Sequence, residues 1–140
     1  MASEFRTRRR IEFEDTDAAG IVHFSRFHVF MEQAEHAFLR SLGLSVHMQL
    51  EGRRLGWPRL SASCEFLEPV RFEEEVEVHL TVKRKGGKSM TYSVEFCRGG
   101  RPVARGEITS VCCERGEDGS LTAIPIPEVF ASRIEEHGPA

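Results

Sequence analysis

One helical pattern constrains the fold of this chain more than any other feature of its sequence. Apolar residues recur at spacings of four, three, four and four, which places them on one stripe of an α-helix. The stripe consists of Phe27, Met31, Ala34, Phe38 and Leu42, and Phe30 and Ala37 widen it. Ser25 is a suitable N-cap and Gly43 a suitable C′ residue. So broad an apolar face must pack against another layer.

The second half of the chain supplies that layer as β-strands. Residues 60–66, 76–82 and 90–96 alternate apolar and polar side chains, and 103–113 do so less regularly. The turn residues between these stretches are Pro69, Gly86-Gly87 and Gly99-Gly100. Their spacing suits an antiparallel meander.

The two ends of the chain complete the expected order of elements. Residues 5–13 alternate and predict a first strand, followed by a glycine-containing loop over 14–24. Val129–Glu136 predict a short terminal helix. One strand, one long helix and four strands give a single α+β domain over 1–140, with the helix packed on a five-stranded antiparallel sheet.

Composition excludes several classes of protein. The net charge of -3 comes from 19 basic and 22 acidic residues, so no global field attracts nucleic acid. The one basic cluster, 83–89, lacks interleaved aromatic residues and argues against a nucleic-acid module. No apolar run follows the basic N-terminus, and none spans a membrane, so neither secretion nor membrane insertion is expected. The four cysteines show no metal-ligand spacing, and we expect a reduced, cytoplasmic protein.

The loop before the helix carries two acids, Asp15 and Asp17. A D-x-D sequence by itself is more often a solvated turn than a catalytic site. It can also bind Mg²⁺ or Ca²⁺, but further oxygen ligands at supporting spacing are missing, so we expect no metal. Gly20 allows the loop an unusual backbone conformation and a close approach.

The segment Arg10–Leu44 resembles the 4-hydroxybenzoyl-CoA thioesterase family of hot-dog proteins. This family includes acyl-CoA thioesterases encoded with Tol-Pal systems. The resemblance rests on the motif Asp15-Thr16-Asp17-Ala18-Ala19-Gly20-Ile21-Val22 and on the capped helix that follows it. It implies a hot-dog fold and hydrolysis of an acyl-CoA thioester without a cofactor. It also implies a homodimer or homotetramer with the active site at the dimer interface.

The same resemblance implies roles for residues of this loop. Asp17 would be the catalytic carboxylate, acting as a nucleophile on the thioester carbonyl or as a general base for water. The backbone amide of Phe24 would donate to the oxyanion, because the first N–H groups of a helix lack internal partners. Asp15 would fix the loop. Relatives that carry a histidine here have it at the position of Phe24, so His23 is kept only as a substrate contact.

Binding of coenzyme A is expected at the basic hairpin. The resemblance implies that Lys88 and Ser89 meet coenzyme A phosphates, with Arg84 and Lys85 as weaker candidates. Trp57 is a candidate wall of the acyl pocket, although core packing explains it equally well.

Three alternatives stay open at this point. Glu32 on the helix is an outside candidate for the catalytic acid, since some hot-dog thioesterases use a helix glutamate. A dehydratase or isomerase acting on thioesters would rely on a catalytic histidine. A non-catalytic acyl-CoA-binding protein would keep the phosphate contacts and tolerate loss of Asp17. The acyl group, aromatic or short to medium aliphatic, and the choice between coenzyme A and acyl carrier protein also stay open.

Overall fold

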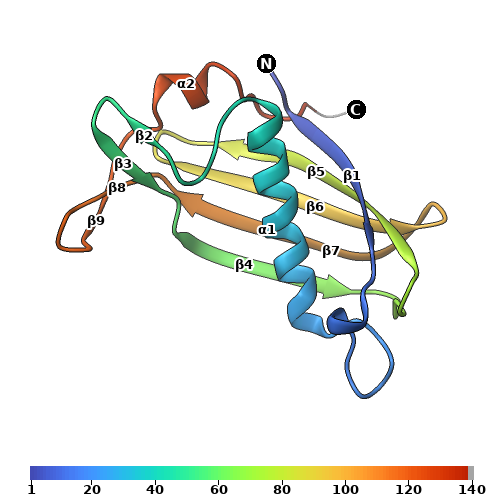
Figure 1. The fold of residues 1–140 in the computed structure, drawn as a ribbon. Coiled ribbons are helices and arrows are strands. Elements are labelled where there is room, and N and C mark those ends of the chain that lie inside the picture. Colours follow the sequence, from blue (N-terminus) through green and yellow to red (C-terminus); the bar gives the residue numbers. More distant parts are fainter. Residues whose placement is uncertain (139–140) are drawn as a thin grey trace.

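A computed structural model describes residues 1–138 and confirms a single long helix on an antiparallel sheet (Figure 1). The helix, α1, spans Phe24–Ser41 and crosses one face of a five-stranded sheet. The strands follow the order β1 (Glu4–Arg10), β5 (Glu75–Lys85), β6 (Ser89–Arg98), β7 (Arg101–Val111) and β4 (Arg59–Phe66). Every pair of neighbours is antiparallel.

The core lies between α1 and the central strands, as the alternating pattern predicts. The inward side chains of β5 and β6 are all buried, namely Val76, Val78, Leu80, Val82, Met90, Tyr92, Val94 and Phe96. The helix contributes Phe27, Phe30, Met31, Ala34 and Phe38 to the same cluster. The opposite face of the sheet carries polar side chains, which is how an antiparallel sheet with one packed face divides its residues.

The ends of α1 agree with the sequence at one terminus and differ at the other. Gly43 has φ +75° and its N–H donates to Arg40, while the Leu44 N–H donates to Leu39, which together make a Schellman motif. The prediction that Ser25 is the N-cap is wrong. His23 takes that position, and its Nδ1 accepts the N–H of Ser25 at 3.3 Å.

Two strands differ from their predicted form. The first ends at Arg10, and a short 3₁₀ turn, η1 (Phe13–Asp15), follows, so that Phe13 is 76% exposed. Strand β4 lies at the edge of the sheet, and its alternating apolar residues are not core: Leu60 is 64% and Phe66 49% exposed. Alternation predicts a strand but does not say whether the sheet continues beyond it.

A second, smaller sheet was not expected from the sequence. It contains β2 (Gln49–Leu50), β3 (Arg53–Gly56), β8 (Cys113–Arg115) and β9 (Leu121–Ala123). These strands have two to four residues, too few to produce a periodic pattern. The predicted C-terminal helix shortens to one turn, α2 (Glu128–Ala131). Within residues 1–138, no helix has both the length and the apolar character needed to cross a membrane.

Candidate active site

The D-x-D loop is a closed turn in front of α1. Thr16 and Val22 form an antiparallel bridge at its base. Within it, the Asp17 N–H donates to Ile21 at 3.0 Å and the Gly20 N–H donates to Asp17 at 2.9 Å. Gly20 has φ +77°, a left-handed conformation that costs a residue with a Cβ about 1–2 kcal/mol. The predicted need for glycine at this position therefore has a structural reason.

The Asp17 side chain is exposed and has one hydrogen bond of its own. Its Oδ1 accepts the N–H of Ala19 at 2.9 Å, an Asx-type turn that fixes the direction of the carboxylate. Asp17 also lines a cavity with Phe24 and Phe27 from the start of α1. The loop therefore holds a carboxylate at the wall of a cavity, where a bound molecule can meet it.

The amides at the start of α1 open on the same region. His23 satisfies two of them, because its Nδ1 accepts from Ser25 and its carbonyl accepts from Arg26 at 2.9 Å. The Phe24 N–H has no hydrogen-bond acceptor among residues 1–138. A free amide at the positive end of a helix dipole is suited to stabilise an oxyanion.

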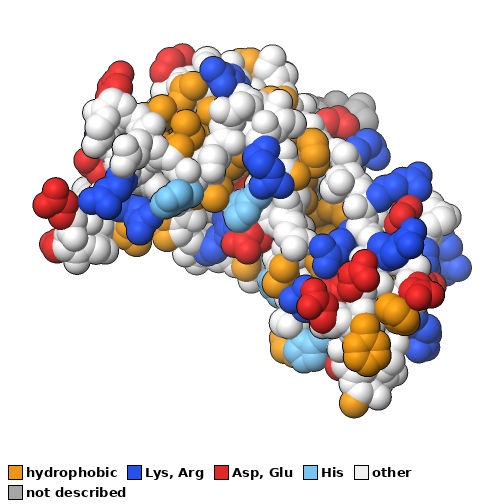
Figure 2. Space-filling model, viewed as in Figure 1, with side chains coloured by type: hydrophobic (Ala, Val, Ile, Leu, Met, Phe, Trp, Pro, Cys, Tyr) orange, Lys and Arg blue, Asp and Glu red, His pale blue; other side chains and the backbone are white. Residues whose placement is uncertain are grey.

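The cavity next to Asp17 has a volume of about 560 Å³ and an apolar wall. This volume lies within the usual range for small-molecule sites. The ring of Phe66 from β4 lies 6.4 Å from that of Phe24 and 5.7 Å from that of Phe27. The remaining lining residues are Ile21, Val22, Leu67, Glu68, Pro69 and Val70. In Figure 2, hydrophobic side chains reach the surface at the lower end of the molecule, where Figure 1 shows the start of α1.

Beneath the loop, Asp15 is fully buried and is held by three donors. Its Oδ1 accepts from Arg26 Nε at 2.8 Å, and its Oδ2 accepts from the Glu12 N–H at 2.8 Å. Arg9 Nη2 lies 3.3 Å from Oδ2. Burial alone would raise the pKa of Asp15, but the bond from Glu12 and the two arginines outweigh it and hold the pKa below its usual value. Asp15 therefore stays ionised and fixes the loop.

The predicted substrate-binding residues do not all meet in one chain. His23 and Phe24 lie beside Asp17, but Arg84, Lys88 and Ser89 lie at or beyond the far end of β5. The register pairs Arg10 with Glu75, so the loop after β1 adjoins the start of β5. An 11-residue strand spans about 35 Å, so the length of β5 separates the hairpin from Asp17 within one chain.

Trp57 belongs to the same far end. Its ring lies 5.3 Å from that of Phe130, and the Val111 N–H donates to the neighbouring Pro58. Ser89 pairs with Val111, and the Cys112 N–H donates to Lys88 at 2.7 Å. Trp57, Lys88 and Ser89 are therefore neighbours, and the predicted site is divided between the two ends of the sheet.

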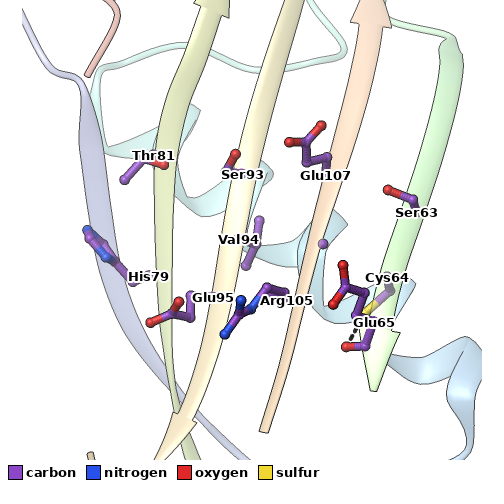
Figure 3. Close-up of a pocket in the computed structure, with 11 residues that line it drawn as sticks. Ser63, Cys64, Glu65, His79, Thr81, Ser93, Val94, Glu95, Arg105 and Glu107 are labelled. Carbon is purple, nitrogen blue, oxygen red and sulfur yellow. Dashed lines mark hydrogen bonds between the residues drawn. The ribbon is translucent and has the colours of Figure 1, made fainter. Parts of the chain in front are cut away.

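A second cavity, of about 500 Å³, lies on the sheet face away from α1 (Figure 3). The side chains of Glu95, Arg105 and Glu107 project into it from adjacent strands. Burial, with a smaller contribution from Glu65, raises the pKa of its one thiol, Cys64, to about 11, which disfavours the thiolate form at neutral pH. None of the predicted site residues lines this cavity.

The sequence contained unused signals for two buried ion pairs. Arg9 lies on the inward face of β1 between Thr7 and Ile11, and a charge on a buried face indicates a partner. Glu35 falls four residues after Met31, at the border of the apolar stripe, and is 1% exposed. It makes a two-pronged pair with Arg59 of β4, at 2.7 and 2.9 Å. Glu32, the outside catalytic candidate, lies 3.5 Å from the same guanidinium.

Comparison with known proteins agrees with the fold. Residues 11–134 match the model of the thioesterase-like superfamily. An Aquifex aeolicus protein, provisionally named an esterase, is 32% identical over 84% of this chain and 89% of its own length. A 1,4-dihydroxy-2-naphthoyl-CoA hydrolase of Synechocystis is 26% identical over 93% and 94%. A solved gentisyl-coenzyme A thioesterase superposes with a TM-score of 0.80 at 29% identity, covering 91% and 99%.

The arrangement defines a thioesterase of the hot-dog class: one long helix on an antiparallel sheet, with a carboxylate loop before the helix. The chain belongs to the thioesterase-like superfamily. The predicted family resemblance, fold and enzyme class are thereby confirmed.

Proposed function

We propose that this protein hydrolyses an acyl-CoA thioester to a free acid and coenzyme A, with Asp17 as the catalytic carboxylate. One observation carries the proposal: Asp17 lines the same apolar cavity as Phe24, whose amide has no acceptor among residues 1–138. The acyl group would occupy the cavity, and its carbonyl oxygen would point at the start of α1. No other group is required, since coenzyme A leaves unchanged.

Two routes fit this arrangement. In the first, a carboxylate oxygen of Asp17 attacks the carbonyl carbon, the C–S bond breaks, and coenzyme A leaves as the thiolate. Water then hydrolyses the acyl–aspartyl anhydride and restores the carboxylate. In the second, Asp17 takes a proton from a water molecule that attacks the carbonyl directly. In both, the Phe24 N–H stabilises the negative oxygen of the tetrahedral intermediate.

Thiol release from a panel of aryl- and alkyl-CoA thioesters tests the proposal. We expect Asp17→Asn to lower kcat by at least about 10²-fold, while substrate still binds. Asp118→Asn is the matched control, because Asp118 also closes an Asx-type turn, accepting the Ser120 N–H at 3.0 Å, but lies far along the chain in a hairpin. Unchanged hydrolysis by Asp17→Asn would show that Asp17 is not catalytic. Binding without hydrolysis in the wild type would favour a non-catalytic acyl-CoA-binding protein.

We further propose an aromatic acyl group as the preferred substrate. Phe24, Phe27 and Phe66 surround the cavity with aromatic faces and edges, which suit a planar ring. The relatives that act on dihydroxynaphthoyl- and gentisyl-coenzyme A support this choice. Greater kcat/KM for aliphatic than for aromatic members of the same panel would contradict it.

The divided site supports a homodimer as the working form. Strand β4 is a free edge with exposed apolar side chains, whereas the other edge, β1, carries arginine at Arg6, Arg8 and Arg10, which discourages edge pairing. A two-fold axis perpendicular to β4, placed at this edge of the sheet, would pair the strand antiparallel with its copy. The Phe66 end of one chain would then lie beside the Arg59 end of the other.

This pairing would bring the two halves of the predicted site together. Trp57, Lys88 and Ser89 lie at the end of the sheet where β4 begins, and Asp17 lies where it ends. The partner's hairpin would thus hold the coenzyme A phosphates while Asp17 of this chain cleaves the thioester.

Mixing two impaired variants tests the shared site. Asp17→Asn disables one half, and Lys88→Ala combined with Ser89→Ala weakens the other. Refolded together, they form mixed dimers with one intact site, so about a quarter of the wild-type activity should return. A monomer by light scattering, or no recovery on mixing, would contradict the shared site.

A further inference from the structure

Asp15 contacts both of the elements that flank the Asp17 loop, strand β1 and helix α1. Arg9 comes from β1, Arg26 from the first turn of α1, and Asp15 from the turn between them. The backbone of Asp15 also joins both sides of the loop, since its N–H donates to Glu12 and its carbonyl accepts from His23, each at 2.9 Å. The loop that carries Asp17 therefore begins and ends on one buried residue.

Arg26 and Phe24 belong to the same helical turn, so the Asp15–Arg26 contact fixes more than the loop. It sets where the first turn of α1, with its free amide, lies relative to the Asp17 carboxylate. Two contacts from Arg26 to Oδ1, at 2.7 and 2.8 Å, hold this position. A partly buried guanidinium with such contacts has few alternative conformations.

We propose that Asp15, Arg26 and Arg9 form a positioning clamp that sets the distance between the Asp17 carboxylate and the Phe24 amide. None of the three touches the thioester. Two arginines against one carboxylate leave one net positive charge at the first turn of α1, in addition to the helix dipole. The proposal rests on the proposed function and adds positioning residues to it.

The packing around Arg9 explains why the clamp holds a fixed geometry. Its guanidinium lies 4.7 Å from the centre of the Phe30 ring, and its Nη1 donates to Gln33 at 2.9 Å. Arg26 lies 6.0 Å from the same ring. Both cations therefore have a second support on α1, and the clamp joins β1, the loop and the helix at one point.

Arg26→Lys tests the clamp, because lysine keeps the positive charge and loses the planar fork. We expect kcat to fall by roughly 10–100-fold with KM within about threefold, since a displacement of about 1 Å costs on that order. Arg26→Gln should lower kcat further than Arg26→Lys, because glutamine lacks the positive charge as well as the planar fork. Arg40→Lys, at the exposed end of the same helix, is the control and should leave kcat unchanged.

Hydrogen–deuterium exchange tests the clamp without relying on activity. In Arg26→Lys, amides of residues 16–24 should exchange faster, while those of β5 and β6 keep the wild-type rate. Unchanged loop exchange, or a kcat equal to that of wild type, would overturn the proposal. If wild type cleaves no thioester, the proposed function is wrong. The exchange rates of amides 16–24 in Arg26→Lys then still test whether the clamp holds the loop. If Arg26→Lys does not fold, Gln33→Ala, which removes only the support of Arg9, takes its place under the same criteria.

Discussion

Two buried carboxylates, one on α1 and one in the turn before it, are each paired with arginine. Glu35, at the middle of the helix, meets the planar fork of Arg59 with both oxygens. Asp15, at the start of the helix, meets two arginines and a backbone N–H, and no single partner satisfies it. The first pair fastens the edge strand β4 to the helix, and the second fastens the loop that carries Asp17.

The two pairs differ in whether apolar side chains could take their place. A two-pronged pair between a helix and a strand joins two elements that are already packed on the same core. For Arg59, burial alone would lower the pKa, but the bond and charge of Glu35 outweigh it, so the guanidinium stays charged. Apolar side chains could not replace the Asp15 network in the same way, because Asp15 also accepts a backbone hydrogen bond that the turn needs. We therefore expect the two sites to respond differently to the same substitutions.

The largest expected effect is the loss of the Asp15 carboxylate. Asp15→Ala leaves Arg9 and Arg26 without their shared partner, and breaking a buried pair in this way costs about 3–5 kcal/mol. Glu35→Ala should cost less, because Arg59 keeps Glu32 and Ser110 as partners. Denaturant unfolding at one fixed protein concentration measures both. An equal or greater loss for Glu35→Ala would remove the distinction between the two sites.

The contribution of Asp15 to stability should depend on pH in the acid range. Its pKa in the folded protein is below the ordinary value of 3.8, so its contribution to stability is present above the unfolded value and is lost as the pH falls through the folded one. The stability difference between wild type and Asp15→Asn should be constant above about pH 5 and shrink below about pH 4. Unfolding curves over this range measure it. A difference that stays constant down to pH 2 would show that the charge of Asp15 is not what stabilises the loop.

The smallest expected effect is replacement of the second pair as a whole. Glu35→Leu, Arg59→Met and Ser110→Ala together remove both charges and the hydroxyl that contacts Arg59. The free energy of unfolding should stay within about 1–2 kcal/mol of wild type, because apolar packing often substitutes for a buried pair. A loss above about 4 kcal/mol would mean that this pair, like Asp15, has no apolar substitute.

Much of the fold was predictable because its elements are long and strongly periodic. Strands β5 and β6 each bury every second residue, and α1 buries four of its five predicted stripe residues outright. Short elements were missed. The four strands of the second sheet have two to four residues each, and their hydrogen bonds depend on partners distant in sequence.

For the candidate site, the structure brings together the predicted residues of one loop and separates them from those at the far end of the sheet. Asp17, Gly20 and Phe24 are close in sequence, and local hydrogen bonds place them together. His23 lies there too, with a capping role that propensity alone assigned to Ser25. Trp57 and Lys88 were expected to bind the substrate on which Asp17 acts. Within one chain, the length of β5 separates them from Asp17. Their roles in binding stay predictions.

The sequence by itself determined the layers and the motif loop, because side-chain periodicity and turn residues act over a few neighbouring positions. Only the tertiary structure decided which charges are buried and which strand is left as an edge. Arg9 lies on the inward face of β1 and Glu35 at the border of the apolar stripe of α1, and they are tolerated there because Asp15 and Arg59 approach from other elements. Such pairings form only when the chain has folded, since a buried charge is stable only where a partner lies within hydrogen-bond distance.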